Sequence, residues 1–226
     1  MTGSWMVRAL VDPEGSREER RVKVSGINFL AAMRPARRIY AETSHMFCKS
    51  FHDVVLGAYS DVDVIILRRD IAETLKSFLD LGFFGPGEVT WPMWMHRPEE
   101  HGSFLRIPPD FVARNATEQA ILYLLDIEKR AQTLPSRYPE VRFHAYRLEE
   151  IARPEGARHL FASLGLEWAE ASEAATRRLV NRRSERKTGR VAVGLDECNV
   201  LISDFETRFA ALGGEIPDLS LCRSLR

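Results

Sequence analysis

The chain has little of what membrane proteins, secreted proteins and disulfide-stabilised domains need. It contains no uninterrupted apolar run of the roughly 18 residues that span a bilayer. Its N-terminal segment carries Arg8 and Asp12 where a secretory signal would be apolar. The three cysteines are odd in number, widely spaced and without a CxxC pair, which argues against a disulfide framework or a zinc site. The sequence therefore predicts a cytoplasmic protein without a membrane partner.

Neither sign of charge is in excess. The chain has 32 Lys and Arg residues against 32 Asp and Glu residues, so its formal net charge is +0. No global field would draw it to nucleic acid or anionic lipid, and we expect no nucleic-acid partner. The pattern GxxxxGK[ST] is also absent, which disfavours an ATPase or an ordinary kinase. Any anion-binding site must therefore be local.

The alternation of apolar segments predicts an α/β fold. With 226 residues, of which 45% are hydrophobic and 28% charged, residues 1–226 are typical of a single domain. Short apolar runs rich in β-forming residues predict strands at residues 39–41, 62–67 and 141–146. Helical periodicity predicts helices at residues 45–58, 71–81 and 117–134. This order favours a parallel sheet flanked by helices.

The end of the second predicted strand is the most informative point of the sequence. Residues 67–77 read Leu-Arg-Arg-Asp-Ile-Ala-Glu-Thr-Leu-Lys-Ser and join a buried strand to a helix, where open parallel sheets bind ligands. Arg69 can meet a phosphate there with two hydrogen bonds, and the first helical turn offers N–H groups to the same anion. Ser77 can add a hydroxyl. The alternative is that Arg and Asp only cap the helix or form a surface ion pair.

This segment resembles the sulfotransferase motif in which a hydrophobic strand ends in Arg-Asp-Pro-x-Asp and a Ser follows eight residues after the Arg. Arg69 and Ser77 have this spacing, Glu73 takes the place of the second acidic residue, and Ile71 replaces the usual proline. The resemblance implies a P-loop-superfamily sulfotransferase-like fold. It also implies that Arg69 and Ser77 bind the 3′-phosphate of the donor, 3′-phosphoadenosine 5′-phosphosulfate.

A second resemblance concerns the catalytic base. Residues 40–47, Tyr-Ala-Glu-Thr-Ser-His-Met-Phe, are similar to the Glu-Lys-Ser-x-x-Tyr/Phe segment of the Golgi-type sulfotransferases, in which the Glu is the base. This implies Glu42 as the group that takes the acceptor's proton. His45 is the alternative, because cytosolic relatives use a His near this strand and imidazole titrates close to neutral pH. If neither residue is catalytic, Glu42 is expected to cap the next helix and His45 to be a surface residue of the first turn of that helix.

A third resemblance completes the nucleotide site. Residues 141–150 and 160–166 are similar to the family's strand ending Arg-Tyr-Glu-Asp-Leu and its helix ending Phe-Leu-Gly-Leu. The resemblance places Tyr146 beside the adenine. In the basic run at 177–190, Arg186 and Lys187 come closest to the Arg-Lys-Gly pattern that closes over the 3′-phosphate, although such a run is usually a solvated face. The reaction that the family implies requires no metal.

The loop that holds the 5′-phosphosulfate in this family is not recognisable. Residues 12–19, after a strand expected at residues 5–11, combine Gly and Ser, but the loop is acidic and wrongly spaced. Three explanations stay open: a start inside a longer reading frame, so that the domain is N-terminally incomplete, a degenerate relative, or a donor held in another way. A strand left uncovered beside residues 62–67 would expose apolar surface, favouring a homodimer or aggregation.

Residues 82–110 are rich in Pro, Trp and Met and predict an irregular lid or a flap packed on the core, with Trp91 and Trp94 as aromatic surface. The expected function is transfer of a sulfuryl group to a hydroxyl or amine of a small-molecule acceptor. One alternative is a non-catalytic relative that acts as a binding or interaction module. Another is a different phosphoryl or nucleotide-using transferase on the same fold.

Overall fold

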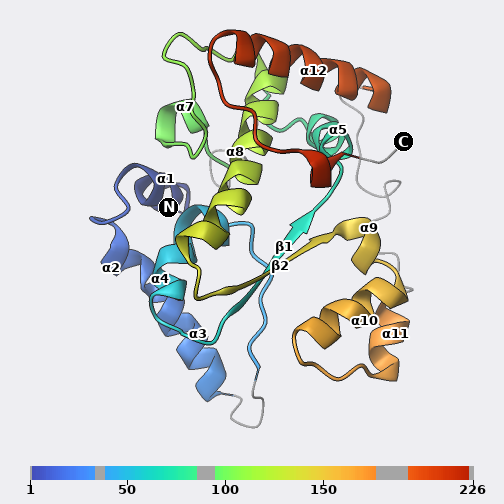
Figure 1. The fold of residues 1–226 in the computed structure, drawn as a ribbon. Helices are drawn as coiled ribbons and strands as arrows, with labels where there is room; N and C mark the ends of the chain where they lie inside the picture. The colour runs from blue at the N-terminus through green and yellow to red at the C-terminus, as the bar shows by residue number, and fades with distance from the viewer. Residues whose placement is uncertain (1, 34–38, 86–94, 177–192, 224–226) are drawn as a thin grey trace.

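The computed structural model describes residues 2–33, 39–85, 95–176 and 193–223. This part of the chain is mixed α/β and mostly helical, with a small two-stranded parallel sheet (Figure 1). None of its described helices combines the length and apolar character that crossing a membrane requires. The helices and helical turns are α1 (Thr2–Val11), α2 (Arg17–Arg20), α3 (Val22–Ala32), the π-helical η1 (Phe47–Phe51), α4 (His52–Leu56), α5 (Ile71–Leu81), α7 (Pro98–His101), α8 (Ala116–Arg137), α9 (Leu148–Ile151), α10 (Pro154–Ser163), α11 (Glu170–Thr176), α12 (Leu195–Ala211) and the 3₁₀ turn η3 (Ser220–Cys222). The strands are β1 (Asp63–Arg68) and β2 (Arg142–Arg147).

Two of the predicted strands are confirmed, each shifted by one residue. β1 pairs with β2 in parallel, from Asp63 opposite Arg142 to Arg68 opposite Arg147. The strand predicted at residues 39–41 is wrong, because residues 39–44 have no regular secondary structure and Ile39 is 61% exposed. Three apolar residues next to polar neighbours bury too little surface to hold a strand in place.

The strand expected at residues 5–11 is also wrong, since these residues lie within the helix α1. A short apolar run fits a buried strand and a helix equally well, so periodicity alone does not separate the two. The helix predicted at residues 45–58 is divided into η1 and α4. Its first turn has a π-helical hydrogen-bond pattern that the sequence did not reveal.

The other helix predictions are confirmed, and their ends have local causes. α5 begins after Asp70, whose side chain accepts a hydrogen bond from the backbone N–H of Glu73 at 2.9 Å, and it ends at Gly82 in the left-handed region, at φ 72°. α8 begins after Asn115, which caps the N–H of Glu118 at 3.0 Å. It continues beyond the predicted end to Arg137.

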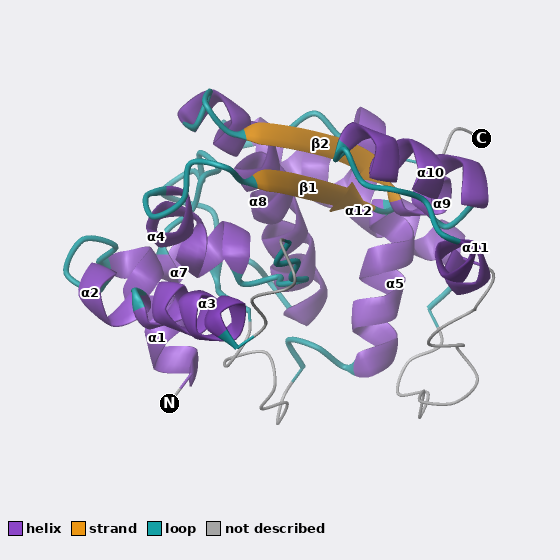
Figure 2. Ribbon diagram, turned by 90° about the horizontal axis from the view of Figure 1, so that it is seen from below, coloured by secondary structure: helices purple, strands orange, loops and turns teal. Residues whose placement is uncertain are grey.

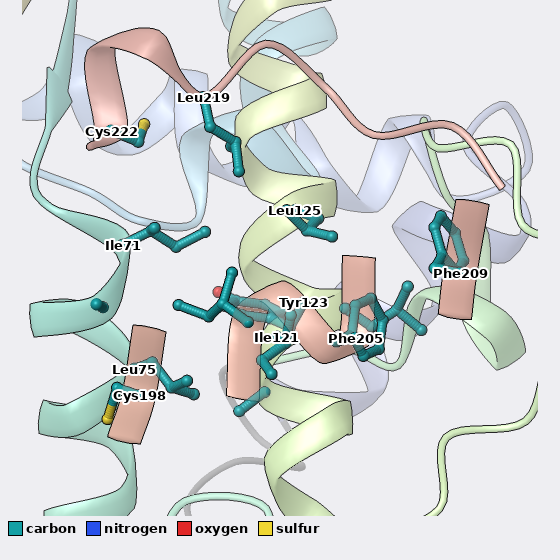
Figure 3. Packing of buried hydrophobic residues seen from close by; sticks show 14 of the residues in the cluster. Ile71, Leu75, Ile121, Tyr123, Leu125, Cys198, Phe205, Phe209, Leu219 and Cys222 are labelled. Carbon is teal, nitrogen blue, oxygen red and sulfur yellow. The ribbon is translucent and has the colours of Figure 1, made fainter. Parts of the chain in front are cut away.

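The hydrophobic core lies between α5, α8 and α12 (Figure 3). Leu75, Leu125 and Phe209 have no exposed surface, and Phe205 stacks on Phe209 with ring centroids 5.5 Å apart. Because Arg68 on β1 pairs with Glu128 on α8, the sheet face carrying Arg68 is turned toward this core. Alternation along β1 leaves Ile65 and Leu67 on the other face, where they are 42% and 49% exposed.

A buried polar network connects α8 to the chain around α7. Asp126, without exposed surface, accepts hydrogen bonds from His96 Nε2 at 2.7 Å, Arg130 Nε at 2.6 Å and Ser103 Oγ at 2.7 Å. The N–H of Phe104 donates to the same carboxylate at 2.7 Å. Burial lowers the pKa of His96, so its ring stays neutral and donates its one N–H to Asp126.

A buried lysine lies near this network. Lys49, on η1, is 3% exposed, and its ammonium donates to the hydroxyl of Tyr123 at 3.1 Å. Burial lowers the pKa of Lys49 to about 8, because an ammonium loses hydration in the interior. At any pH at which the buried Lys49 is protonated, its positive charge therefore lowers the free energy of unfolding.

Replacing the central carboxylate should destabilise the protein strongly. We expect Asp126→Asn to lower the free energy of unfolding by about 3–5 kcal/mol, because Arg130 is left buried without its anion. Urea denaturation followed by circular dichroism measures this. The exposed Asp110→Asn is the matched control and should change it by less than about 0.5 kcal/mol. A loss below about 1 kcal/mol for Asp126→Asn would contradict the assigned role of the network.

The buried lysine predicts a pH dependence. Below pH 8 the folded and unfolded states both hold the Lys49 proton, and the buried charge costs stability. Between the folded-state pKa of about 8 and the unfolded value of 10.5, only the unfolded state keeps the proton. Relative to Lys49→Met, the free energy of unfolding of the unmodified chain should therefore rise by about 1 kcal/mol per pH unit from pH 8 to 10. A difference that stays constant would contradict this.

Candidate anion-binding site

The candidate site lies where the two parallel strands end. β1 leads directly into α5 through Arg69 and Asp70, and β2 leads directly into α9. Figure 2 shows both arrows pointing toward the side of the molecule where α5, α9, α10 and α11 gather. Arg68 and Arg147 are paired in register at this edge. The edge therefore concentrates arginine side chains near the first turn of α5.

The two adjacent arginines of β1 have different surroundings. Arg68 is buried, and its Nε lies 2.8 Å and 3.1 Å from the two carboxylate oxygens of Glu128. The thiol of Cys222 donates to the same carboxylate at 3.2 Å. Burial, together with this carboxylate, raises the pKa of Cys222 to about 12. Arg68 is thus committed to an internal ion pair.

Arg69, by contrast, faces solvent. Its side chain is 38% exposed and pairs with Glu73, one turn into α5, at 2.7 Å. Glu73 and Ser77 are neighbours at i,i+4 on α5 and share one face of this helix. Ser77 is half-buried. The side chain of Arg69 thus reaches Glu73, which lies one turn before Ser77 on α5.

Tyr146 belongs to the same edge. It is paired with Leu67 in the sheet, two residues before Arg69. Its hydroxyl lies 3.0 Å from His159 Nδ1 and 3.1 Å from Ser163 Oγ, both on α10. The ring of Tyr146 is thus fixed against α10, beside the exposed side chain of Leu67.

Glu42 lies in the exposed segment before η1. It forms an ion pair with Lys23 on α3 and accepts a hydrogen bond from the hydroxyl of Tyr40 at 2.5 Å. Partial burial raises the pKa of Glu42, but the Lys23 and Tyr40 hydrogen bonds outweigh it and hold the pKa below its ordinary value. The same bond raises the pKa of Tyr40 to about 12. Within the described residues, the hydrogen bonds and ion pair of Glu42 lead to Lys23 and Tyr40, and not to Arg69, Ser77 or Tyr146.

His45, the alternative base, lies at the start of the turn that leads into η1. Partial burial and the nearby Lys49 ammonium lower its pKa, so the ring is neutral at physiological pH and can accept a proton. The predicted Arg186 and Lys187, and the aromatic pair Trp91 and Trp94, lie outside the described residues.

The sequence motifs give no role to several residues of this edge. These include Arg68, Glu128 and Arg147, although an Arg at an inward position of a buried strand indicates a buried anion nearby. His159 and Ser163 were also missed. Their i,i+4 spacing on an amphipathic helix was the available signal.

The fold and this site define a mixed α/β protein with an arginine at a strand-to-helix turn. No family model, no curated protein and no solved structure matches the chain.

The two arginines should respond differently to substitution. Arg68→Ala should lower the free energy of unfolding by about 3 kcal/mol, because Glu128 stays buried without its cation. Arg69→Ala should change it by less than about 0.5 kcal/mol, because an exposed i,i+4 ion pair contributes little. Urea denaturation of both variants measures the contrast. Losses of similar size would contradict the assignment of one buried and one available arginine.

Proposed function

We propose that the carboxyl edge of β1 and β2 binds the 3′-phosphate end of 3′-phosphoadenosine 5′-phosphosulfate, and that the chain acts as a sulfotransferase-like protein. The sulfuryl group would pass to a hydroxyl or amine of a small-molecule acceptor. The observation that carries this proposal is the position of Arg69, which is 38% exposed at the turn from β1 to α5 and pairs with Glu73, one helical turn before Ser77.

The chemistry of this turn suits a phosphate. The guanidinium of Arg69 can donate two parallel hydrogen bonds, and the positive end of the α5 dipole favours the same anion. Glu73 must release Arg69 first. An exposed ion pair of this kind is worth only about 0–1 kcal/mol, so a dianionic phosphate can replace it. The hydroxyl of Ser77 then completes the set of donors.

The neighbouring surface suits a flat heterocycle. Tyr146 offers an aromatic ring whose hydroxyl is already fixed by His159 and Ser163. Leu67, 49% exposed beside it, adds apolar surface on the same face of the sheet. An aromatic ring next to apolar surface, with cations one step away, fits a purine that carries a phosphate.

The transfer step needs a base at the acceptor. In this proposal the acceptor oxygen or nitrogen forms a new bond to sulfur, the bond from sulfur to the bridging phosphate oxygen breaks, and the acceptor's proton goes to Glu42 or His45. Glu42, with its lowered pKa, is ionised at neutral pH and has room for a proton. Its ion pair with Lys23 would have to open for the acceptor to reach it.

A second candidate function is that of a non-catalytic relative, which binds the 3′-phosphate end of the nucleotide at this edge of the sheet but transfers no sulfuryl group. One observation favours it. In the turn at residues 12–19, the N–H of Gly15 donates to Asp12 Oδ1 at 2.9 Å, and Ser16 Oγ donates to the backbone of Asp12 at 2.7 Å. Arg20, the last residue of α2, is buried in an ion pair with Asp53. These donors are engaged internally, so the turn does not fit a 5′-phosphosulfate.

Calorimetric titration with 3′-phosphoadenosine 5′-phosphate tests the binding site. We expect micromolar affinity for the unmodified chain and a loss of about 10- to 100-fold for Arg69→Ala, since a charge-assisted pair is worth roughly 1.5–3 kcal/mol. Ser77→Ala should also weaken nucleotide binding, but by a factor several-fold smaller than Arg69→Ala does. Arg17→Ala, another exposed arginine paired with a nearby Glu, is the matched control and should bind normally. A folded chain that binds no nucleotide would overturn the proposal.

The same protein separates the two candidates. Incubation with 3′-phosphoadenosine 5′-phosphosulfate and a panel of phenols, alcohols and amines is followed by mass spectrometry for a sulfated product. Turnover that is lost in Glu42→Gln, with nucleotide affinity retained, supports the enzyme with Glu42 as its base. Turnover kept in Glu42→Gln but lost in His45→Ala selects the alternative base. Nucleotide binding without turnover on any acceptor supports the non-catalytic relative.

A further inference from the structure

Helix α3 carries apolar residues around its whole circumference, yet it lies at the surface. None of its residues is buried. Phe29 is 64% exposed, Leu30 46%, and Met33, directly after the helix, 66%. Isolated exposed apolar side chains are ordinary, but a helix that is apolar on all sides is normally covered. Figure 1 shows α3 at the edge of the molecule, away from the core helices α5, α8 and α12.

The chain that follows α3 adds to this surface. Ile39 is 61% exposed and Tyr40 41%. Tyr40 donates to Glu42, which pairs with Lys23 on α3, so the extended segment lies beside the helix. We call Phe29, Leu30, Met33, Ile39 and Tyr40 the α3 surface.

Side chains from outside α3 hold this helix in place. The hydroxyl of Tyr59 bonds to the backbone oxygen of Val24 at 3.3 Å and to Asn28 Oδ1 at 2.8 Å. The Lys23 ammonium lies over the ring of Phe51, 6.0 Å from its centroid. The α3 surface is therefore formed before any partner arrives, which lowers the entropic cost of docking.

We propose that the α3 surface is a homodimer interface, occupied by the same surface of a second copy of this chain. Its five side chains expose roughly 500 Å² of mainly apolar area, judging from their exposed fractions and ordinary side-chain areas. A standard interface buries roughly 800 Å² per partner, and somewhat more than half of that area is apolar. The apolar area of the α3 surface is therefore about as large as the apolar part of a standard interface. A two-fold axis would let each surface cover the other.

A lipid surface fits less well. Helices that lie on membranes have a basic face opposite an apolar one. The one cation within α3, Lys23, is already paired with Glu42. The interface does not rest on the proposed nucleotide site.

Sedimentation velocity over total concentrations from about 1 to 100 micromolar tests the proposal. We expect the unmodified chain to form a dimer in this range. Phe29→Ser combined with Met33→Ser should weaken the dimer at least about tenfold, because two central apolar side chains are lost. Val112→Ser combined with Val200→Ser, at positions 71% and 58% exposed outside this surface, is the matched control and should dimerise normally. Ile39→Ser, outside any helix, is a second variant that leaves α3 intact and should also weaken the dimer.

Other outcomes would overturn the interface. These are a chain that stays monomeric at every concentration, a dimer that persists in both test variants, and a broad series of aggregates without a defined dimer. Flotation of a monomeric chain with vesicles of phosphatidylcholine and phosphatidylserine, lost in the Phe29 and Met33 variant, would assign the surface to lipid instead. Unchanged circular dichroism and melting temperature of each variant show that folding is retained.

Discussion

The carboxylate of Asp126 is the interaction on which the arrangement of the helices depends. It lies in the middle of α8 without exposed surface and holds the chain around α7 through His96, Ser103 and Phe104. Two residues further along α8, Glu128 holds Arg68 at the end of β1. Successive side chains of a helix point in widely different directions. One helix therefore fixes a loop on one side and the edge of the sheet on the other.

This anchoring separates the charged groups that stabilise the fold from the charged groups that a ligand can reach. Arg68, Glu128 and Cys222 form a closed group beneath the carboxyl edge. Arg69 and Glu73 form an open pair above it. Arg68 ties the end of β1 to α8, whereas the next residue, Arg69, stays exposed at the start of α5. A binding side chain that is positioned without being buried keeps its charge accessible to a ligand and loses little conformational freedom when the ligand arrives.

The sequence predicted those parts of the fold that depend on local order. α5 and α8 follow from apolar periodicity, and β1 and β2 follow from short apolar runs rich in β-forming residues. The ion pair of Arg68 with Glu128 joins residues 60 apart, and no local pattern announces it. The wrong strand at residues 5–11 arose because a short apolar run has no unique period. The binding and catalytic roles of five residues stay predictions: Arg69, Ser77, Tyr146, Glu42 and His45.

Alternation along β1 has a consequence for how the chain tolerates changes in length. Side chains on a strand change face at every residue, so the roles of Arg68 and Arg69 are set by whether a position is odd or even relative to the register with β2. Deleting one residue between Asp63 and Leu67, with the register of the earlier residues kept, would move each arginine back by one position. Arg69 would then face Glu128, and Arg68 would face water. Inserting one residue would instead turn Leu67 toward Glu128. The length of β1 is therefore constrained by the positions of the two arginines, whereas the turn before Asp63 is free of this constraint.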